Sequence, residues 1–250
     1  MIIDTHRGQR FPADPEAIKL MLKQMQWWGI EKSIVWSLAR EPAQMGPNND
    51  YVNRLVKEHH GKIIPFASVY PHDPKNAVKE LSRAIKQLGF AGLKIHPKRQ
   101  EIKMNHPSVI EVVRAARDLD IPVVFHVDSP DVSNFRYNQE IIDHDTQYAK
   151  AKFLLDIIKE YNSPNLWAAH MGGATVPAIQ KSRIVFQTCV ARVPTIEEAV
   201  RSIGSDRIVF GSDHPWCDVI DEIAKVDHAQ ISDSDKEKIY YTNAVRLLKL

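Results

Sequence analysis

The sequence predicts a (β/α)8 barrel, the TIM-barrel fold, as one domain over residues 1–250. The chain has 250 residues, the usual size of a single barrel of this kind. Eight short apolar runs rich in β-branched residues alternate with segments of helical periodicity, and such alternation requires parallel strands joined by helical crossovers. No glycine-rich phosphate-binding fingerprint follows the first run, which disfavours an open dinucleotide-binding sheet.

The apolar runs are short enough to be strands buried on both faces. We expect strands at residues 1–5, 33–37, 63–69, 92–95, 122–127, 165–169, 184–188 and 208–211. Their carboxyl ends meet at one mouth of a closed barrel, which is where enzymes of this fold place their catalytic groups.

The helices between these runs carry recognisable end signals. In the first, Asp14 can cap the free amides, Pro15 suits the first helical position and Gly29 suits the left-handed stop. Asp73, Pro74 and Gly89 repeat this pattern. Further helices are expected near residues 50–60, 107–119, 147–161, 176–181, 195–203 and 233–249. The longest polar connection, residues 128–145, has the length of a lid or binding loop.

Composition narrows the class of protein. The formal net charge of +2, with acidic and basic residues mixed, predicts neither a nucleic-acid partner nor an anionic membrane surface. No apolar run approaches the roughly 20 residues of a membrane span. Cys189 and Cys217 are too few for a disulfide framework and are interpreted as reduced thiols. We therefore expect a cytoplasmic protein that acts on a small molecule, as a monomer or a homo-oligomer.

Four polar residues close apolar runs at the predicted mouth: His6, His126, His170 and Asp213. A single histidine at a strand end is more often structural than a ligand. Together these residues supply neutral imidazoles and a carboxylate, the ligand chemistry of zinc, manganese or iron. A divalent ion there, with zinc as the first candidate, would activate a bound water near neutral pH, and Asp213 could accept the water's proton.

Lys94 and His96 alternate within the fourth run and so share one face of the strand. We expect both to bind substrate, together with Arg136 on the long loop. Lys94 could hold a carboxylate, polarise a carbonyl or, if carboxylated, bridge two metals. The alternative is that His96, followed by Pro97, only closes the strand. Further loop residues that could select a substrate are Arg40, Asp128, Tyr137 and His214.

Across its whole length the sequence resembles the amidohydrolase superfamily, and within it the broad amidohydrolase-2 branch, which includes decarboxylases and lactonases. The resemblance rests on the ordered motifs Ile3-Asp4-Thr5-His6, Gly92-Leu93-Lys94-Ile95-His96-Pro97, Pro122-Val123-Val124-Phe125-His126, Ala169-His170-Met171-Gly172-Gly173, Phe210-Gly211-Ser212-Asp213-His214-Pro215 and Tyr241-Thr242-Asn243-Ala244. It implies a (β/α)8 barrel in which His6, His126 and Asp213 bind a metal, while Asp213 and His170 are catalytic.

One position departs from the family pattern. The first strand normally ends in His-x-His, but here the run is His6-Arg7-Gly8. Three outcomes are open: the metal is kept with an altered ligand set, the reaction proceeds without metal through His and Lys groups, or catalysis is lost.

The main functional hypothesis is an amidohydrolase-like enzyme that hydrolyses a small, carboxylated substrate. Non-oxidative decarboxylation or a metal-independent lactonase reaction at the same site is the alternative. A barrel that binds a ligand or partner without chemistry is the alternative from another class. A TatD-type nuclease fits less well, because no basic surface is indicated.

Overall fold

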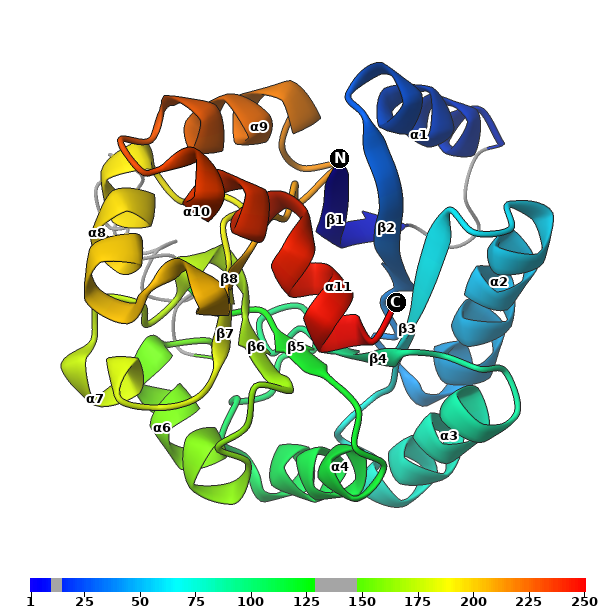
Figure 1. The fold of residues 1–250 in the computed structure, drawn as a ribbon. Coiled ribbons are helices and arrows are strands. Elements are labelled where there is room, and N and C mark those ends of the chain that lie inside the picture. The colour runs from blue at the N-terminus through cyan, green and yellow to red at the C-terminus, as the bar shows by residue number, and fades with distance from the viewer. Residues whose placement is uncertain (10–14, 129–147) are drawn as a thin grey trace, which may run out of the picture.

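The computed structural model of the protein describes residues 1–9, 15–128 and 148–250. Its eight strands form one sheet in the order β1 to β8, and each neighbouring pair from β1–β2 to β7–β8 is parallel. The strands are β1 (Ile2–Gln9), β2 (Ile30–Ser37), β3 (Ile63–Ser68), β4 (Gly92–Ile95), β5 (Val123–Phe125), β6 (Leu166–Ala168), β7 (Val185–Gln187) and β8 (Ile208–Val209). Figure 1 shows them as a ring of strands inside a ring of helices, which confirms the predicted barrel.

Backbone hydrogen bonds bring the first and last strands together. The Thr5 amide donates to the Phe210 carbonyl at 3.0 Å, and the Asp213 amide donates to the His6 carbonyl at 2.9 Å. The Gly8 amide donates to the His214 carbonyl at 3.2 Å. Because these bonds join residues about 200 positions apart in sequence, they place the end of β1 beside the chain that follows β8.

Helices cover the outside of the barrel. They are α1 (Pro15–Trp27), α2 (Met45–Glu58), α3 (Pro74–Lys86), α4 (Pro107–Asp118), α6 (Ala151–Glu160), α7 (Pro177–Gln180), α8 (Val193–Ile203), α9 (Val219–His228), α10 (Asp233–Glu237) and α11 (Asn243–Leu248). The signals at the start of α3 act as predicted, since the Asp73 side chain accepts a hydrogen bond from the Asn76 amide and Pro74 opens the helix. Among the described residues, no helix is long and apolar enough to traverse a bilayer.

Two apolar clusters follow the alternation of side chains along the strands. The larger cluster lies between the strands and the helices and includes Leu93 and Ile95 of β4. The smaller one fills the barrel interior. It contains Ile3, Ile34, Trp36, Ile64, Phe66, Val124, Trp167, Val185 and Val209. Because Leu93 and Ile95 face outward, Lys94 between them faces the interior.

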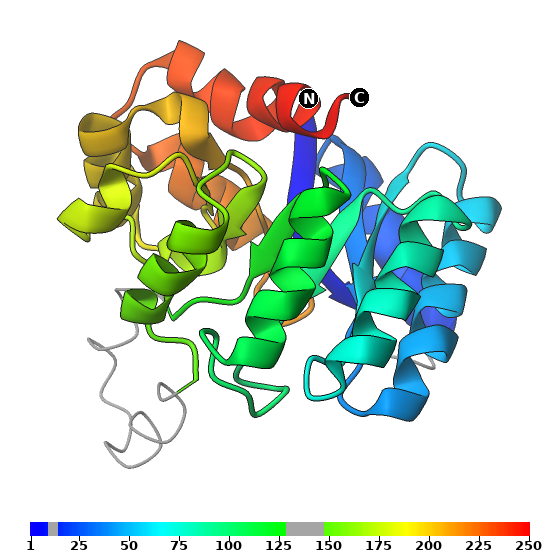
Figure 2. The ribbon, with the colours of Figure 1, turned by 90° about the horizontal axis from the view of Figure 1, so that it is seen from below.

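The C-terminal helix closes the end of the barrel at which the chain begins. Ala244 of α11 belongs to the interior cluster, and Val245, Leu247 and Leu248 pack against it. Figure 2 shows α11 beside the N-terminus, at the end opposite the carboxyl ends of the strands. With one end covered, the other end is left to form a site.

The helix predicted at residues 233–249 is divided into α10, a π-helical turn and α11, and β2 begins at Ile30 rather than at residue 33. The largest differences from the prediction are in β1 and α9. β1 continues through Gln9 rather than ending at residue 5, because the buried Arg7 is accommodated by the Gln24 side chain at 2.6 Å and by Asp4 at 3.7 Å. The helix α9 was not predicted. It buries a carboxylate, Glu222, on its inner face, where Glu222 accepts from the Val190 amide and from Lys225.

Candidate active site

Side chains from distant strands meet at the carboxyl end of the barrel. His6 Nε2 lies 3.3 Å from the Asp213 Oδ1 atom and 3.3 Å from Lys94 Nζ. The rings of His6 and His170 have centroids 5.1 Å apart. His126 follows, with its Nδ1 atom 2.8 Å from His170 Nε2. The structure thus brings together the groups that the sequence placed at the predicted mouth.

Gln187 fixes the orientation of the His6 ring. The Gln187 Nε2 amide donates to the Thr5 carbonyl at 2.6 Å and to Thr5 Oγ1 at 3.0 Å, so its Oε1 atom must accept. That oxygen lies 2.6 Å from His6 Nδ1, which therefore carries the proton. Burial and the nearby charge of Lys94 lower the pKa of His6, so the ring is neutral. His6 Nε2 consequently presents a lone pair to the mouth.

Asp213 is held by the preceding residue, Ser212, which bonds to the buried Asp4. The Ser212 amide and hydroxyl donate to the two carboxylate oxygens of Asp4 at 2.9 and 2.7 Å. Asp4 also accepts from the His6 amide at 3.2 Å. One carboxylate therefore positions His6 and Asp213 together. Although burial raises the pKa of Asp213, its interactions with His170, His6 and Lys94 lower it to about 2, so Asp213 is ionised.

Lys94 is a buried amine at the centre of the site. Its side chain is inaccessible to solvent, and Nζ lies 4.9 Å from the centre of the Trp36 ring. Burial lowers the pKa of Lys94 to about 7, although the charge of Asp213 favours the protonated form. An amine with this pKa can give or take a proton near neutral pH.

The imidazoles of His96, His126 and His170 form a neutral cluster. His96 stacks on His126 with a centroid separation of 3.9 Å and an angle of 14° between the rings. Burial lowers the pKa of all three rings, that of His170 to about 3 and those of His96 and His126 well below the usual range. The shared inward face predicted for Lys94 and His96 places His96 in this cluster.

Left-handed backbone marks the same region. The φ angles of His170, Met171 and Asp213 are 59°, 53° and 54°. Non-glycine residues seldom adopt this conformation, which costs on the order of 1–3 kcal/mol and tends to occur at functional sites. Two of the three residues are the predicted catalytic pair.

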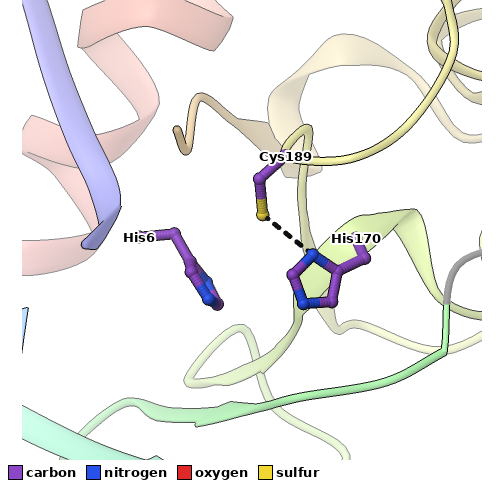
Figure 3. A group of neighbouring side chains, drawn as sticks. All are labelled: His6, His170 and Cys189. Atoms are coloured by element: carbon purple, nitrogen blue, oxygen red, sulfur yellow. Dashed lines mark hydrogen bonds between the residues drawn. The ribbon is translucent and has the colours of Figure 1, made fainter. Parts of the chain in front are cut away.

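The donor atoms at the mouth fit a divalent ion. The His6 lone pair faces the Asp213 carboxylate at 3.3 Å, close to the edge of about 3.3 Å in a tetrahedral shell with bonds of about 2.0–2.1 Å. A cation between or beside two such acceptors stabilises them, and this cation can be a divalent ion or the Lys94 ammonium. Among the described residues, His6, His170 and Cys189 also offer donor atoms that lie within 4.8 Å of one another (Figure 3). Protonated Lys94 donates to the same His6 lone pair and would compete with an ion.

Gly8 leaves little room for a side chain. A Cβ atom on Gly8 would lie 2.6 Å from Cζ3 and 2.8 Å from Cη2 of the Trp216 indole. Trp36 lies on the other side, with Cζ2 at 3.5 Å from that position. The space beside Gly8 is therefore occupied by tryptophan, and the first strand supplies one donor, from His6.

A polar cavity of about 230 Å³ lies beyond these tryptophans. Its lining residues are Arg40, Tyr70, His72, Arg99, Gln100 and Glu101. Gln100 forms a rigid floor, since its amide donates to the carbonyls of Ala39 and Val69 at 2.8 and 2.7 Å. The Arg99 guanidinium lies 5.2 Å from the centre of the Trp216 ring, which links the cavity to the mouth.

Some predicted site residues lie outside the described part of the chain. Arg136 and Tyr137 fall within residues 129–147, as does most of the predicted lid loop. Conversely, the site contains three residues that the sequence did not predict: Gln187, Cys189 and Trp216. Gln187 and Cys189 could have been found, because they share one face at the end of the seventh strand. Trp216 carried no comparable signal.

Comparisons with known proteins agree with this architecture. The Amidohydro_2 family model, described as Amidohydrolase, matches residues 9–250. The gamma-resorcylate decarboxylase of Polaromonas sp. (strain JS666 / ATCC BAA-500) is 23% identical over 279 residues, which cover 95% of this chain and 85% of that protein.

Two solved structures share the fold. One is a dihydroxybenzoic acid decarboxylase from Polaromonas sp. JS666 with bound manganese and 2-nitroresorcinol, with a TM-score of 0.78, 21% identity and coverage of 100% and 97% of the two chains. The other, 5-carboxyvanillate decarboxylase from Sphingomonas paucimobilis, has a TM-score of 0.80, 14% identity and coverage of 100% and 99%. The family match spans nearly the whole chain, and the chain therefore belongs to the amidohydrolase family.

Proposed function

We propose that this protein is an enzyme that decarboxylates a small hydroxylated aromatic acid without an oxidant. The observation that carries the proposal is the buried Lys94 amine, 3.3 Å from His6 Nε2 and attracted by the Asp213 carboxylate. It places a cation and a proton donor at the point where strands of the barrel converge. The relatives named above favour decarboxylation over hydrolysis, since all three act on aromatic carboxylic acids.

The reaction needs one proton at one carbon. A proton is added to the ring carbon that bears the carboxylate, the bond between that carbon and the carboxyl carbon breaks, and its electron pair returns to the ring as carbon dioxide leaves. In our proposal Lys94 donates the proton, because it is the described buried group whose pKa lies near neutrality. Asp213 stabilises the protonated amine beforehand, and His170 assists in returning a proton to it.

We propose that His6, Asp213 and His170 would hold a divalent ion. When bound, such an ion would orient the acid and withdraw electron density from it. The Gln187 and Asp4 contacts prepare the site, because they fix the His6 tautomer and the position of Asp213. Zinc, manganese and iron are all compatible with nitrogen and oxygen donors. His126 contacts this set through its Nδ1 atom, 2.8 Å from His170 Nε2, and its role as a metal ligand stays a prediction.

The cavity next to the site has the charge to bind an anionic substrate. Arg40 and Arg99 line the cavity, and neither forms a salt bridge with another residue in the described ranges. Guanidinium groups bind carboxylates in a bidentate manner. We therefore propose Arg40 and Arg99 as substrate-binding residues, alongside the earlier prediction for Arg136.

The test is a carbon dioxide release assay on the full chain, with and without added manganese or zinc. The panel contains 2,6-dihydroxybenzoate and 5-carboxyvanillate, with aryl esters and lactones as the hydrolysis arm. Release of carbon dioxide, with one solvent deuteron in the product formed in D2O, is the expected result. Turnover of only esters or lactones would support the hydrolase hypothesis instead, and binding without turnover would support a non-catalytic barrel.

A further inference from the structure

The buried group His6, His170 and Cys189 has a composition that the family pattern does not contain. His6 lies in β1, while His170 and Cys189 follow β6 and β7, and none of the three is more than 3% exposed. In Figure 3 the Cys189 sulfur points toward the His170 ring, and Sγ lies 3.3 Å from His170 Nδ1. The thiol is therefore aimed into the mouth rather than into the surrounding core.

Gly211 makes the approach of this sulfur possible. A Cβ atom on Gly211 would lie 2.7 Å from the His6 Cβ and 3.5 Å from Cys189 Sγ. The missing side chain therefore leaves a gap that His6 and the sulfur share, between β1 and β7. On the other side of His6, Trp216 fills the space beside Gly8. Trp216 therefore blocks a donor at position 8, while Gly211 leaves room for the Cys189 sulfur.

We propose that Cys189 is a ligand of the bound divalent ion and replaces the imidazole that is absent at Gly8. This inference rests on the ion site of the proposed function. Cys189 would join His6, His170 and Asp213 as a ligand, and the thiol would release its proton to solvent when the sulfur binds the ion. Thiolate ligands favour zinc over harder ions such as manganese. The protein therefore prefers zinc, unlike the manganese-bound structure from Polaromonas sp. JS666.

X-ray absorption at the zinc edge tests the ligand directly on the full chain loaded with one equivalent of zinc. We expect one sulfur neighbour at about 2.3 Å, with nitrogen or oxygen neighbours at about 2.0–2.2 Å. Cys189→Ser should remove the sulfur signal and weaken zinc binding by at least about tenfold. Cys217→Ser is the matched control, since Cys217 is the other cysteine, and it should keep both the signal and the affinity.

The wild-type spectrum decides the matter even if Cys189→Ser fails to fold. Bound zinc without sulfur, or no zinc binding, would overturn the inference. The same loss of sulfur signal in Cys217→Ser would overturn it as well, because the sulfur would then be that of Cys217. A sulfur-bound zinc in a protein that releases no carbon dioxide would support this inference and overturn only the proposed decarboxylation.

Discussion

His6 and Asp213 are positioned by hydrogen bonds from residues outside the mouth, whereas the rings of His96, His126 and His170 contact one another. On the first side, Gln187 and Asp4 fix a tautomer and a carboxylate through short hydrogen bonds. On the second side, stacking at 3.9 Å and one contact of 2.8 Å join three neutral rings. We call these the anchored side (His6 and Asp213) and the histidine side (His96, His126 and His170).

The difference indicates that the two sides have different roles in the site. Groups fixed by outer hydrogen bonds are suited to hold an ion or a charge in one place. Neutral rings that contact each other keep water and charge away from the same space, which strengthens electrostatic interactions there. Lys94 contacts the anchored side through His6, and the charge of Asp213 favours its protonated form.

Removing Lys94 should have the largest effect. Lys94→Met takes away the proposed proton donor and should lower kcat/KM for decarboxylation by about 10²–10⁴-fold. Zinc or manganese affinity should stay equal or rise, because no ammonium then competes for the His6 lone pair. Steady-state kinetics and equilibrium dialysis measure the two effects. Lys86→Met, an exposed change on α3, is the control, and near-normal activity in Lys94→Met would refute the assigned role.

Gln187 tests the anchored side. Gln187→Leu leaves the His6 tautomer free and should weaken ion binding by about 10–100-fold, as measured by dialysis. Gln187→Glu keeps an acceptor for His6 Nδ1 but loses the amide that donates to the Thr5 carbonyl, so it should recover only part of that affinity. Equal losses in the two variants would mean that Gln187 acts by packing alone.

The pH dependence of kcat/KM tests whether Lys94 or a residue of the histidine side supplies the proton. If Lys94 donates it, activity is full below its pKa and falls tenfold per unit as pH rises above about 7. A donor on the histidine side would lose its proton far lower, since the pKa of His170 is lowered to about 3. A profile that rises through pH 7 would make Lys94 a base and would favour hydrolysis.

Gly8→Ala should have the smallest effect. Its Cβ would meet the Trp216 indole at 2.6 Å, so the variant should lose about 1–3 kcal/mol in the free energy of unfolding. In a Trp216→Ala background the same change should cost much less, which urea unfolding of the four proteins can measure. Additive losses would show that the two residues do not constrain each other.

The sequence allowed the barrel and the convergence of His6, Lys94, His170 and Asp213 to be predicted, because periodicity and strand ends carry that information. It did not reveal α9, since the buried Glu222 interrupts the apolar stripe and is satisfied only by tertiary partners. Nor could it reveal Trp216 against Gly8 or the sulfur beside His170. Those contacts depend on the path of loops after the strands, which local patterns do not encode.

The end of β7 and the turn that follows it bring two side chains of different chemistry to one place. Gln187 and Cys189 are two residues apart, so both reach the mouth only in the present register. A deletion or insertion of one residue in this short strand would turn the amide and the sulfur outward together. We therefore expect β7 to tolerate changes of its outward residue Phe186 far better than any change in its length.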